Sequence, residues 1–352
     1  MTFLILFFFT NFNTRLDYSI FEALNLVYQD DYIFAEQIFD SLITKYPGNS
    51  ISYVLKAGLL DAYMLDHSTN EWEPDFYHTI EKGIAVGKKS LKEARTREDS
   101  GWSYFSLASL YGYRAVRKGR HKSYLKALSD AYKAISYYKK TLRIYPELYD
   151  AYLGLGTFHF ALSVLPRFVK WFIAPGDYRE KALEEIKLAA DSAKYTRIPA
   201  RDEYAWVLAF LKPSRKAVRI AKSVVDSYPN SRSFMWTLAF TYRRRGHWWE
   251  VERVFKKLVP MTLKDQREYY YSLTILYYNL AKAKYFNAHT DDAEWYLDLA
   301  YFYLYFVREK MPDMDDVKKG MDRLRKWINR RKQWRVEHGP IKNFRRVQTR
   351  RH

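Results

Sequence analysis

The residue types that carry most enzyme chemistry are absent or scattered in this sequence. The chain has no cysteine, which excludes disulfides, thiolate metal sites and cysteine nucleophiles. Its eight histidines show no metal-binding spacing, and no G-x-S-x-G motif occurs. The stretch 154–156 (GLG) lacks the third glycine of a phosphate loop, and 313–315 (DMD) lacks the other ligands of an EF-hand. The sequence therefore predicts no catalytic residue, no metal site and no cofactor.

Positive charge is concentrated at the C-terminal end. Of the net charge of +19, residues 323–352 contribute twelve Lys or Arg and one acid, a net +11 that leaves +8 for the rest. Aromatic side chains interleave with these cations, and we predict contact between an anionic membrane surface and Arg330, Arg331 and Trp334. Nucleic acid, bound by phosphate neutralisation and stacking, is a less favoured interpretation. The alternative to both binding interpretations is a solvated capping helix with a flexible basic end that has no ligand.

The first fourteen residues, 1–14, form an apolar segment that begins MTFLILFFF. It is too short to span a bilayer, which takes ~20 residues. Its apolar run is similar to the core of a secretory signal peptide, although the preceding positive charges and an A-x-A cleavage site are missing. We expect a cleaved signal and a protein of the bacterial periplasm or cell envelope. The alternative is a cytoplasmic protein whose apolar arm packs on the first helices.

The elements that must position any binding residue follow a two-helix repeat, which is clearest over residues 229–263. Large and small apolar residues alternate there at helical spacing, so that one helix nests against the next. Gly246 stands where the first helix must turn into the second. The repeat residues are Met235, Leu238, Ala239, Tyr242, Gly246, Trp248, Val251, Phe255 and Leu258.

This pattern resembles the tetratricopeptide repeat, a pair of helices with a period of roughly 34 residues. The resemblance implies that each pair needs stacked neighbours to bury its apolar face. Similar but less regular helix pairs occupy most of the chain. The third pair carries a long basic insertion, which we predict to be a solvated turn between two extended helices. The pairs cover residues 17–47, 50–94, 104–146, 151–190, 198–229, 229–263 and 270–300.

The fourth pair carries an apolar insertion between its helices. Phe168, Trp171 and Phe172 in this insertion are predicted to cover a neighbouring layer or to contact a membrane or partner. The surrounding segment, 151–190, is similar to one in the eukaryotic tetratricopeptide-repeat thirty-nine family and its fungal relatives linked to inclusion-body clearance. The resemblance implies a shared architecture, suggests partner-binding or lipid-associated roles only loosely, and brings no catalytic residue. The matching positions are Gly156, Phe158, Ser163, Leu165, Pro166, Gly176, Asp177 and Leu183.

In tetratricopeptide proteins, a fixed set of first-helix positions lines a concave groove, and the resemblance transfers these positions to this chain. They are rich in aromatic and arginine residues, which suit an extended peptide or a carboxylate-bearing tail. The alternative is that several of them pack inside a tightly wound superhelix. The predicted groove residues are Trp102, Phe105, Tyr113, Trp236, Phe240, Arg243, Arg244, Tyr271, Tyr278 and Asn279.

We therefore predict an all-α, right-handed superhelical solenoid of about seven tetratricopeptide-like helix pairs over residues 17–311. A capping helix is expected at 313–336 and a basic, disordered tail at 337–352. The predicted function is that of a non-catalytic scaffold that binds a protein or peptide in its groove. The alternative is a cytoplasmic adaptor whose basic tail engages nucleic acid or an anionic membrane.

Overall fold

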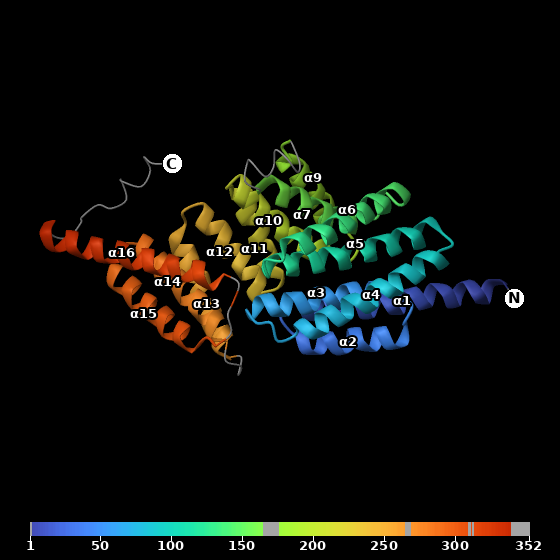
Figure 1. The fold of residues 1–352 in the computed structure, drawn as a ribbon, viewed down its shortest axis with the longest axis horizontal. Helices are drawn as coiled ribbons and strands as arrows, with labels where there is room; N and C mark the ends of the chain where they lie inside the picture. Colours follow the sequence, from blue (N-terminus) through green and yellow to red (C-terminus); the bar gives the residue numbers. More distant parts are fainter. Residues whose placement is uncertain (1, 165–175, 265–268, 309–310, 312, 339–352) are drawn as a thin grey trace. The chain divides into compact units, whose positions relative to one another are not determined.

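The computed structural model describes residues 2–164, 176–264, 269–308, 311 and 313–338. Within these residues there are fifteen helices and no strand (Figure 1). Two compact units divide the chain, and each is treated separately. Unit 1 comprises Met1–Asp66 and Asn70–Thr241, and unit 2 comprises His67–Thr69 and Tyr242–His352.

Unit 1 consists of helices that follow one another as antiparallel neighbours. Most contacts join a helix to the next one along the chain, which is the packing of a solenoid. Its helices are α1 (Thr2–Val27), α2 (Tyr32–Lys45), α3 (Ser50–Asp66), α4 (Glu73–Glu93), α5 (Arg97–Arg120), α6 (Tyr124–Ile144), α7 (Asp150–Val164), α9 (Arg179–Ser192), α10 (Arg197–Leu211), α11 (Arg215–Ser227) and most of α12 (Arg232–Arg244).

Unit 2 continues the same order of helices and ends in a long polar helix. It contains the end of α12, then α13 (Trp248–Lys264), α14 (Tyr270–Phe286), α15 (Thr290–Phe306) and α16 (Met314–His338). The His67–Thr69 turn belongs to this unit, because the Ser272 hydroxyl donates to the His67 carbonyl at 3.0 Å. The predicted all-α solenoid fold is therefore confirmed within each unit.

The helices form where the apolar spacing predicts them. In α11, Ala217, Ala221 and Val224 are buried at intervals of four and three residues, while the rest of the helix is mostly polar. Gly246 has a φ of 72°, a left-handed conformation that glycine adopts without strain, and it lies between α12 and α13 as predicted.

Close helix approach in the fourth pair depends on Gly156. A Cβ atom at this position would lie 2.5 Å from Ile186 Cγ1 and 2.9 Å from the Ile186 backbone nitrogen. Because α7 and α9 touch here through backbone atoms, a side chain would push them apart. Gly156 is one of the positions shared with the second family resemblance, and its role is close packing.

The third pair confirms the prediction of extended helices, since α5 has 24 residues and α6 has 21. The basic residues near their turn are less solvated than the sequence suggests. Arg117 is buried and pairs with Glu73 at 3.0 Å. Arg114 makes a bidentate contact with Asp130, with nitrogen–oxygen distances of 2.8 and 2.9 Å. These cations bind helices together, so reading the whole cluster as a solvated turn is wrong.

Unit 1 also makes contacts between its first helices and its last. The hydroxyl of Tyr28 donates to the carbonyl of Tyr195 at 3.3 Å, and Lys194 pairs with Asp17 at 2.8 Å. The ring of Tyr195 lies 5.4 Å from that of Trp102. Helices far apart in the sequence therefore meet inside this unit.

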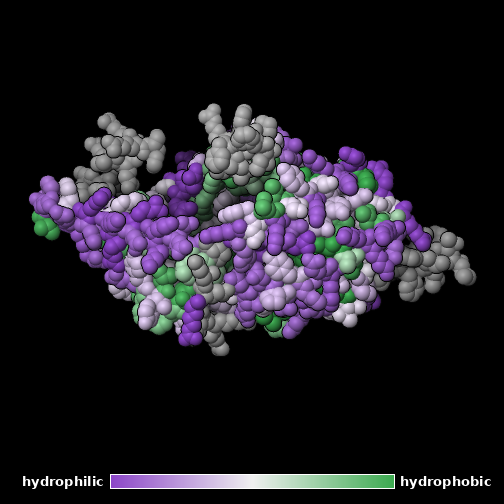
Figure 2. All heavy atoms as spheres, viewed as in Figure 1, coloured by the Kyte–Doolittle hydropathy of each residue, from purple (hydrophilic) through white to green (hydrophobic). Residues whose placement is uncertain are grey.

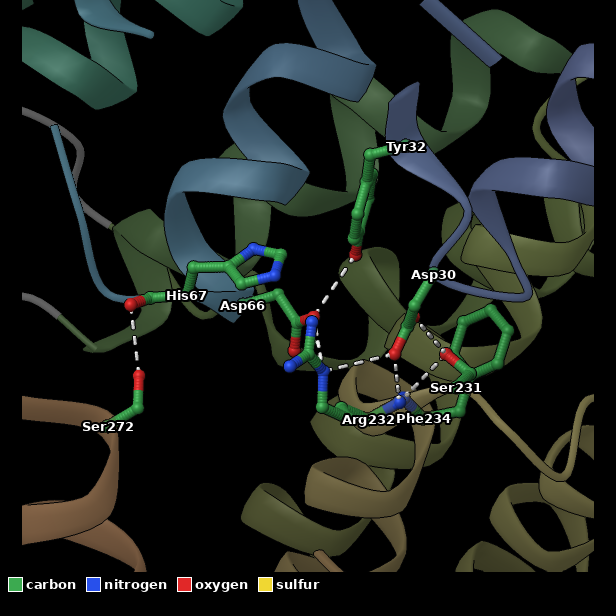
Figure 3. A network of polar contacts seen from close by, with 8 residues as sticks. All are labelled: Asp30, Tyr32, Asp66, His67, Ser231, Arg232, Phe234 and Ser272. Atoms are coloured by element: carbon green, nitrogen blue, oxygen red, sulfur yellow. Dashed lines mark hydrogen bonds and ion pairs between the residues drawn. The ribbon is translucent and has the colours of Figure 1, made fainter. Parts of the chain in front are cut away.

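A buried ion cluster makes the longest-range of these contacts (Figure 3). Arg232, at the start of α12, points between Asp30 and Asp66, which come from the α1–α2 turn and the end of α3. Its guanidinium lies 3.3 Å from Asp30 Oδ2 and 2.8 Å from Asp66 Oδ2, and its backbone N–H donates to Asp30 at 2.7 Å. Buried carboxylates need such a partner to remain charged.

Helix α16 covers α14 and α15 in unit 2. Met321, Leu324 and Ile328 are buried along one side of it, which is what a terminal capping helix requires. Asp315 and Asp316 lie in its first turn, where they favour the helix dipole. The helix begins one residue after the predicted start and continues to His338.

Hydrophilic side chains cover most of the face seen in Figure 2, and hydrophobic ones occur in small groups. Among the residues searched, none of the helices combines the length and the apolar character that crossing a bilayer requires.

Candidate functional site

The first three predicted groove residues lie in unit 1 and pack into its interior. Phe105 is 3% exposed, and its ring lies against that of half-buried Trp102. Burial raises the pKa of Tyr113, whose hydroxyl occupies the space beside Gly58. The structure therefore contradicts an open groove at Phe105. The physical reason is the contact between early and late helices, which fills the interior with rings.

Trp236 and Phe240 of α12 are half-buried rather than enclosed. Phe240 stacks on Trp206 of α10 with ring centroids 5.0 Å apart and an interplanar angle of 18°. Trp206 in turn meets Phe160 of α7 edge to face at 5.5 Å. Three consecutive first helices thus contribute to one row of aromatic side chains.

In unit 2, the predicted groove residues divide into two groups. Arg243 and Arg244 are exposed, and Tyr278 is half-buried. Tyr271 and Asn279 are buried, which contradicts their prediction as groove residues. The Tyr271 hydroxyl donates to Asp313 at 2.7 Å, and the Asn279 amide donates to the Ile275 carbonyl at 2.8 Å, so both serve the packing of α14.

The residues predicted to contact a membrane or partner differ in their exposure. Phe168, Trp171 and Phe172 lie outside the described residues. Arg330 and Trp334 are exposed on α16. Arg331 is buried, donates to the Tyr285 carbonyl at 2.5 Å and covers the Tyr285 ring at 3.6 Å, so its prediction as a surface contact is wrong.

One surface in unit 1 combines carboxylates with the aromatic row, and we call it the acidic face. It consists of Asp202, Glu203 and Trp206 of α10, Phe160 of α7 and Phe240 of α12. Asp202 accepts a hydrogen bond from Thr237 at 2.8 Å, and Glu203 accepts one from Thr157 at 2.6 Å. The α10 carboxylates therefore bind the preceding and the following first helix.

Both carboxylates of the acidic face are held in a desolvated environment. Burial raises the pKa of Asp202 to about 8, and the neighbouring charge of Glu203 adds to this effect. Burial likewise raises the pKa of Glu203 to about 7. Oδ1 of Asp202 is buried and accepts no hydrogen bond from any described residue. Within the described residues, neither carboxylate has a Lys or Arg partner.

Sequence reasoning missed Asp202, Glu203 and Trp206, although the repeat register contains a signal for one of them. Asp202 is at the repeat position that Ser233 has in the next pair, and this position belongs to the set that lines the groove. Two adjacent acids next to the apolar second half of α10 were the observable feature. The hydrogen bonds to Thr157 and Thr237 depend on tertiary packing.

Unit 2 carries a contrasting surface, which we call the basic face. It comprises Arg243 of α12, Tyr278 and Lys282 of α14, and Arg323 of α16. The Lys282 ammonium lies 4.0 Å from the centroid of the Tyr278 ring. Burial lowers the pKa of Lys282 to about 7, and the charge of Arg243 lowers it further. Considering the described residues alone, Lys282 has no carboxylate partner.

His159 joins two helices of the fourth pair. It is buried, and its Nδ1 lies 2.5 Å from Glu185 Oε2, while its ring stacks on Tyr178 with centroids 5.4 Å apart. This is a hydrogen-bonded packing role between α7 and α9.

Comparison with known proteins gives only distant similarities. No protein-family model matches the chain, and no curated protein does either. Among solved structures, it is similar to a tetratricopeptide repeat protein from Parabacteroides merdae, at 14% identity over 88% of this chain and 98% of that one, with a TM-score of 0.41. The P58(IPK) TPR domain matches at 14% identity over 91% and 99%, with a TM-score of 0.30. Yeast Tom70 matches at 12% identity over 88% of both chains, with a TM-score of 0.32.

These identities and TM-scores are low, so the fold assignment depends on the chain itself. The helix pairs in both units, the repeat residues over 229–263 and the turn at Gly246 together define the architecture. The fold is a tetratricopeptide-type solenoid.

Proposed function

We propose that this protein is a non-catalytic scaffold that binds a partner polypeptide on the basic face of unit 2. The observation that carries the proposal is Lys282, a half-buried lysine whose ammonium group lies 4.0 Å from the centroid of the Tyr278 ring and that no described acid neutralises. Helix α14 is the first helix of its pair, the element on which tetratricopeptide-type folds place their binding residues. Arg243, exposed beside it, supplies a second cation.

The chemistry of this face suits an acidic segment or a carboxylate-bearing tail. A buried ammonium costs free energy unless an opposite charge or a hydrogen-bond acceptor approaches it. A carboxylate of the partner would restore the interaction that the Lys282 ammonium lacks. The half-buried Tyr278 ring offers apolar contact beside these charges.

Binding of a labelled oligoglutamate peptide to the full-length protein tests this proposal. We expect Lys282→Met to weaken the affinity by about tenfold or more, which corresponds to a loss of at least ~1.4 kcal/mol. The matched control is Lys257→Met, which removes an exposed lysine of α13 in the same unit. Equal affinities for wild type and Lys282→Met would contradict the basic face as the binding site.

The alternative, an adaptor that acts through its basic end, now has fewer free cations. Lys332 pairs with Asp291 at 3.3 Å, and Arg335 donates to the Ala288 carbonyl at 3.1 Å, so these side chains hold α16 onto α15 and the turn before it. Arg330 and Trp334 remain exposed for such contact. Binding to anionic vesicles or to RNA that falls steeply with salt would support this alternative.

Export to a bacterial envelope stays a prediction from the apolar N-terminal segment. The N-terminal sequence of the protein isolated from its own cell tests it. A mature start near residues 13–17 in an envelope fraction would support an exported scaffold, whereas an intact Met1 in the cytosol would contradict it.

A further inference from the structure

Unit 1 has an open groove along its first helix pair, where α1 and α2 lie side by side (Figure 1). The groove has a volume of about 800 Å³, and we call it the α1–α2 groove. Its lining runs from Arg15 to Leu26 on α1 and from Phe34 to Tyr46 at the end of α2, and no other described element contributes to it. The packing of unit 1 therefore leaves this surface open.

The lining residues form two matching stripes along the groove. On α1 the stripe runs from Arg15 to Leu26 at intervals of four, three and four residues, and on α2 it runs from Phe34 to Lys45 at the same intervals. Each stripe spans three helical turns, or roughly 16 Å. Two such stripes are the surface on which a third helix packs against a helix pair. The α1–α2 groove therefore fits one face of a helix of about three turns.

Helices α1 and α2 hold on to the rest of unit 1 through other faces. Ile20 of α1 and Phe39 of α2 are fully buried, and the ring of Phe21 packs against that of Tyr195 with centroids 5.6 Å apart. In the groove, by contrast, Tyr18 is 72% exposed and Phe34 is 60% exposed. These two large rings are available to a partner without any change in the core.

The two ends of the α1–α2 groove differ in character. Leu26 and Phe34 lie near the turn that joins the two antiparallel helices, whereas Arg15 and Lys45 lie together at the opposite end. Both cations are exposed, and neither pairs with a carboxylate of any described residue. Neither has an acid three or four positions away on its own helix, where a local ion pair would form. Glu22, also exposed, lies between the two ends.

Charge distinguishes between the candidate occupants of this groove. Residues 323–352 of this chain carry a net charge of +11, so Arg15 and Lys45 repel that segment. Two copies of the groove paired face to face in register would place the cations against cations or against the apolar end, and neither arrangement supplies a carboxylate. A helix of another protein with carboxylates at one end is complementary to the groove.

We propose that the α1–α2 groove binds an amphipathic helix of a partner protein, with its apolar side against Leu26 and Phe34 and its carboxylates at the Arg15–Lys45 end. Helix α16 packs in a similar way within unit 2, where its apolar side covers α14 and α15. A basic or hydroxyl side chain in the middle of the partner helix suits Glu22. This inference goes beyond the proposed function, because it assigns a second surface that does not depend on the basic face.

Fluorescence anisotropy of a labelled peptide with the full-length protein tests the proposal. The probe is an alanine-based helix of about 15 residues, with leucines along one stripe and glutamates at one end of it. Two versions carry the glutamates at the N-terminal or the C-terminal end, because the groove admits either direction. We expect one version to bind, and its counterpart with lysines in place of the glutamates to bind about tenfold more weakly. A failure of both glutamate peptides to bind would overturn the proposal.

Charge reversal in the protein should reverse this preference. Arg15→Glu with Lys45→Glu should weaken binding of the glutamate peptide by about tenfold or more and should favour the lysine peptide. Both side chains are exposed, so the variant should fold. The matched control is Lys139→Glu with Arg143→Glu, at exposed positions of α6 in the same unit. Equal weakening in this control, or an unchanged preference in the Arg15/Lys45 variant, would overturn the proposal.

Phe34→Ala separates docking in the groove from general charge attraction. It should weaken binding of the glutamate peptide several-fold and leave the melting temperature close to that of wild type, because the ring is exposed. Tyr132→Ala on α6, where the side chain is 56% exposed, is the control and should bind like wild type. Equal peptide affinities for Phe34→Ala and this control would count against the groove.

Two further measurements distinguish the proposed occupant from the alternatives. Sedimentation of the full-length protein should show no dimer that Phe34→Ala dissociates, and such a dimer would overturn the proposal because a second copy would then occupy the groove. Lys282→Met, on the basic face of unit 2, should leave the affinity for the glutamate peptide unchanged. A loss of affinity in that variant would place the peptide on the basic face and contradict the assignment to the α1–α2 groove.

Discussion

Units 1 and 2 contain buried charges of opposite sign that have no described counter-ion. In unit 1 these are the carboxylates of Asp202 and Glu203, and in unit 2 it is the ammonium of Lys282. Each unit also contains compensated charges. Arg232 lies between Asp30 and Asp66 in unit 1, and Lys284 lies 3.1 Å from Glu252 and 2.7 Å from Asp292 in unit 2.

The paired and the unpaired charges have different roles: the paired charges hold the fold together, and the unpaired charges are candidates for binding. The compensated groups join different helices: Arg232 links α12 to the α1–α2 turn, and Lys284 links α14 to its neighbours α13 and α15. The uncompensated groups lie on α10 and α14, each the first helix of its pair, beside aromatic rings. Because an unpaired charge costs stability when it is desolvated, Lys282 indicates a site that an external group completes.

Opposite charges also predict opposite pH dependences of stability in the two units. The pKa of Asp202 is raised from 3.8 to about 8, so the folded state of unit 1 loses stability as pH rises through this range. The pKa of Lys282 is lowered from 10.5 to about 7, so unit 2 gains stability as pH rises from about 7 to 10.5. Four variants test this difference between the units.

The largest effect is expected from Arg232→Met. This change leaves the Asp30 and Asp66 carboxylates buried without their cation, which should lower the free energy of unfolding of unit 1 by about 3–5 kcal/mol. Thermal denaturation followed by circular dichroism measures the loss. The control is Arg219→Met on α11, where the side chain is exposed. A variant as stable as this control would show that the cluster does not stabilise the fold.

A packing change in unit 1 comes next. Gly156→Ala should cost roughly 1–3 kcal/mol, because its Cβ would meet the backbone of α9. Gly112→Ala is the contrasting control, since the nearest atom to its Cβ is 3.9 Å away and alanine favours helix by up to about 1 kcal/mol. Chemical denaturation should therefore give shifts of opposite sign, and two equal shifts would contradict the described approach of α7 and α9.

Neutralising the acidic face should stabilise unit 1 without a bound partner. We expect Asp202→Asn with Glu203→Gln to raise the free energy of unfolding by roughly 1–3 kcal/mol at pH 8. The gain should shrink as pH falls towards the ordinary pKa values of 4.5 and 3.8, and it should vanish below them, where the wild-type carboxylates are protonated in both states. Melting temperatures measured across this range test the sign, and a gain that grows on acidification would refute the assignment of buried negative charge.

The smallest effect is expected from Lys282→Met. Stability should rise by about 1 kcal/mol at pH 6, because the Tyr278 ring already offsets part of the cost of the buried ammonium. The gain should shrink as pH rises from about 7 and should disappear only above pH 10.5, where the wild-type amine is neutral in both states. Hydrogen exchange of α14 amides can follow unit 2 alone, and a loss of protection at pH 6 would mean that the lysine has a stabilising partner.

The spacing of apolar residues predicted most of the helices, because a helix that buries one face has apolar residues at every third or fourth position. Ala217, Ala221 and Val224 are buried as expected, and Gly246 makes the expected turn. The repeat register was less informative about the groove. It assigned Phe105 and Tyr271 to an exposed face, whereas both are buried, because the register gives the side of a helix and not what covers it.

Contacts across long stretches of chain could not be predicted. Arg232 and Asp30 are separated by 202 residues, and no local pattern links them. The carboxylates of Asp202 and Glu203 were visible as adjacent acids, but their desolvation arises from three helices that come together only in the folded protein. The sequence therefore predicted that binding residues lie on the first helix of a pair, but it did not predict which of them are desolvated charged groups.

The most direct test of the opposite buried charges is an NMR titration of side chains in the full-length protein. Selective carbon-13 labelling of Asp, Glu and Lys side chains, with Asp202→Asn, Glu203→Gln and Lys282→Met for assignment, would report each pKa. We predict that the carboxyl groups lost in Asp202→Asn and Glu203→Gln titrate near 8 and near 7, and that the amine lost in Lys282→Met titrates near 7. Carboxyl groups that all titrate near 4 and lysines that all titrate above 10 would contradict it.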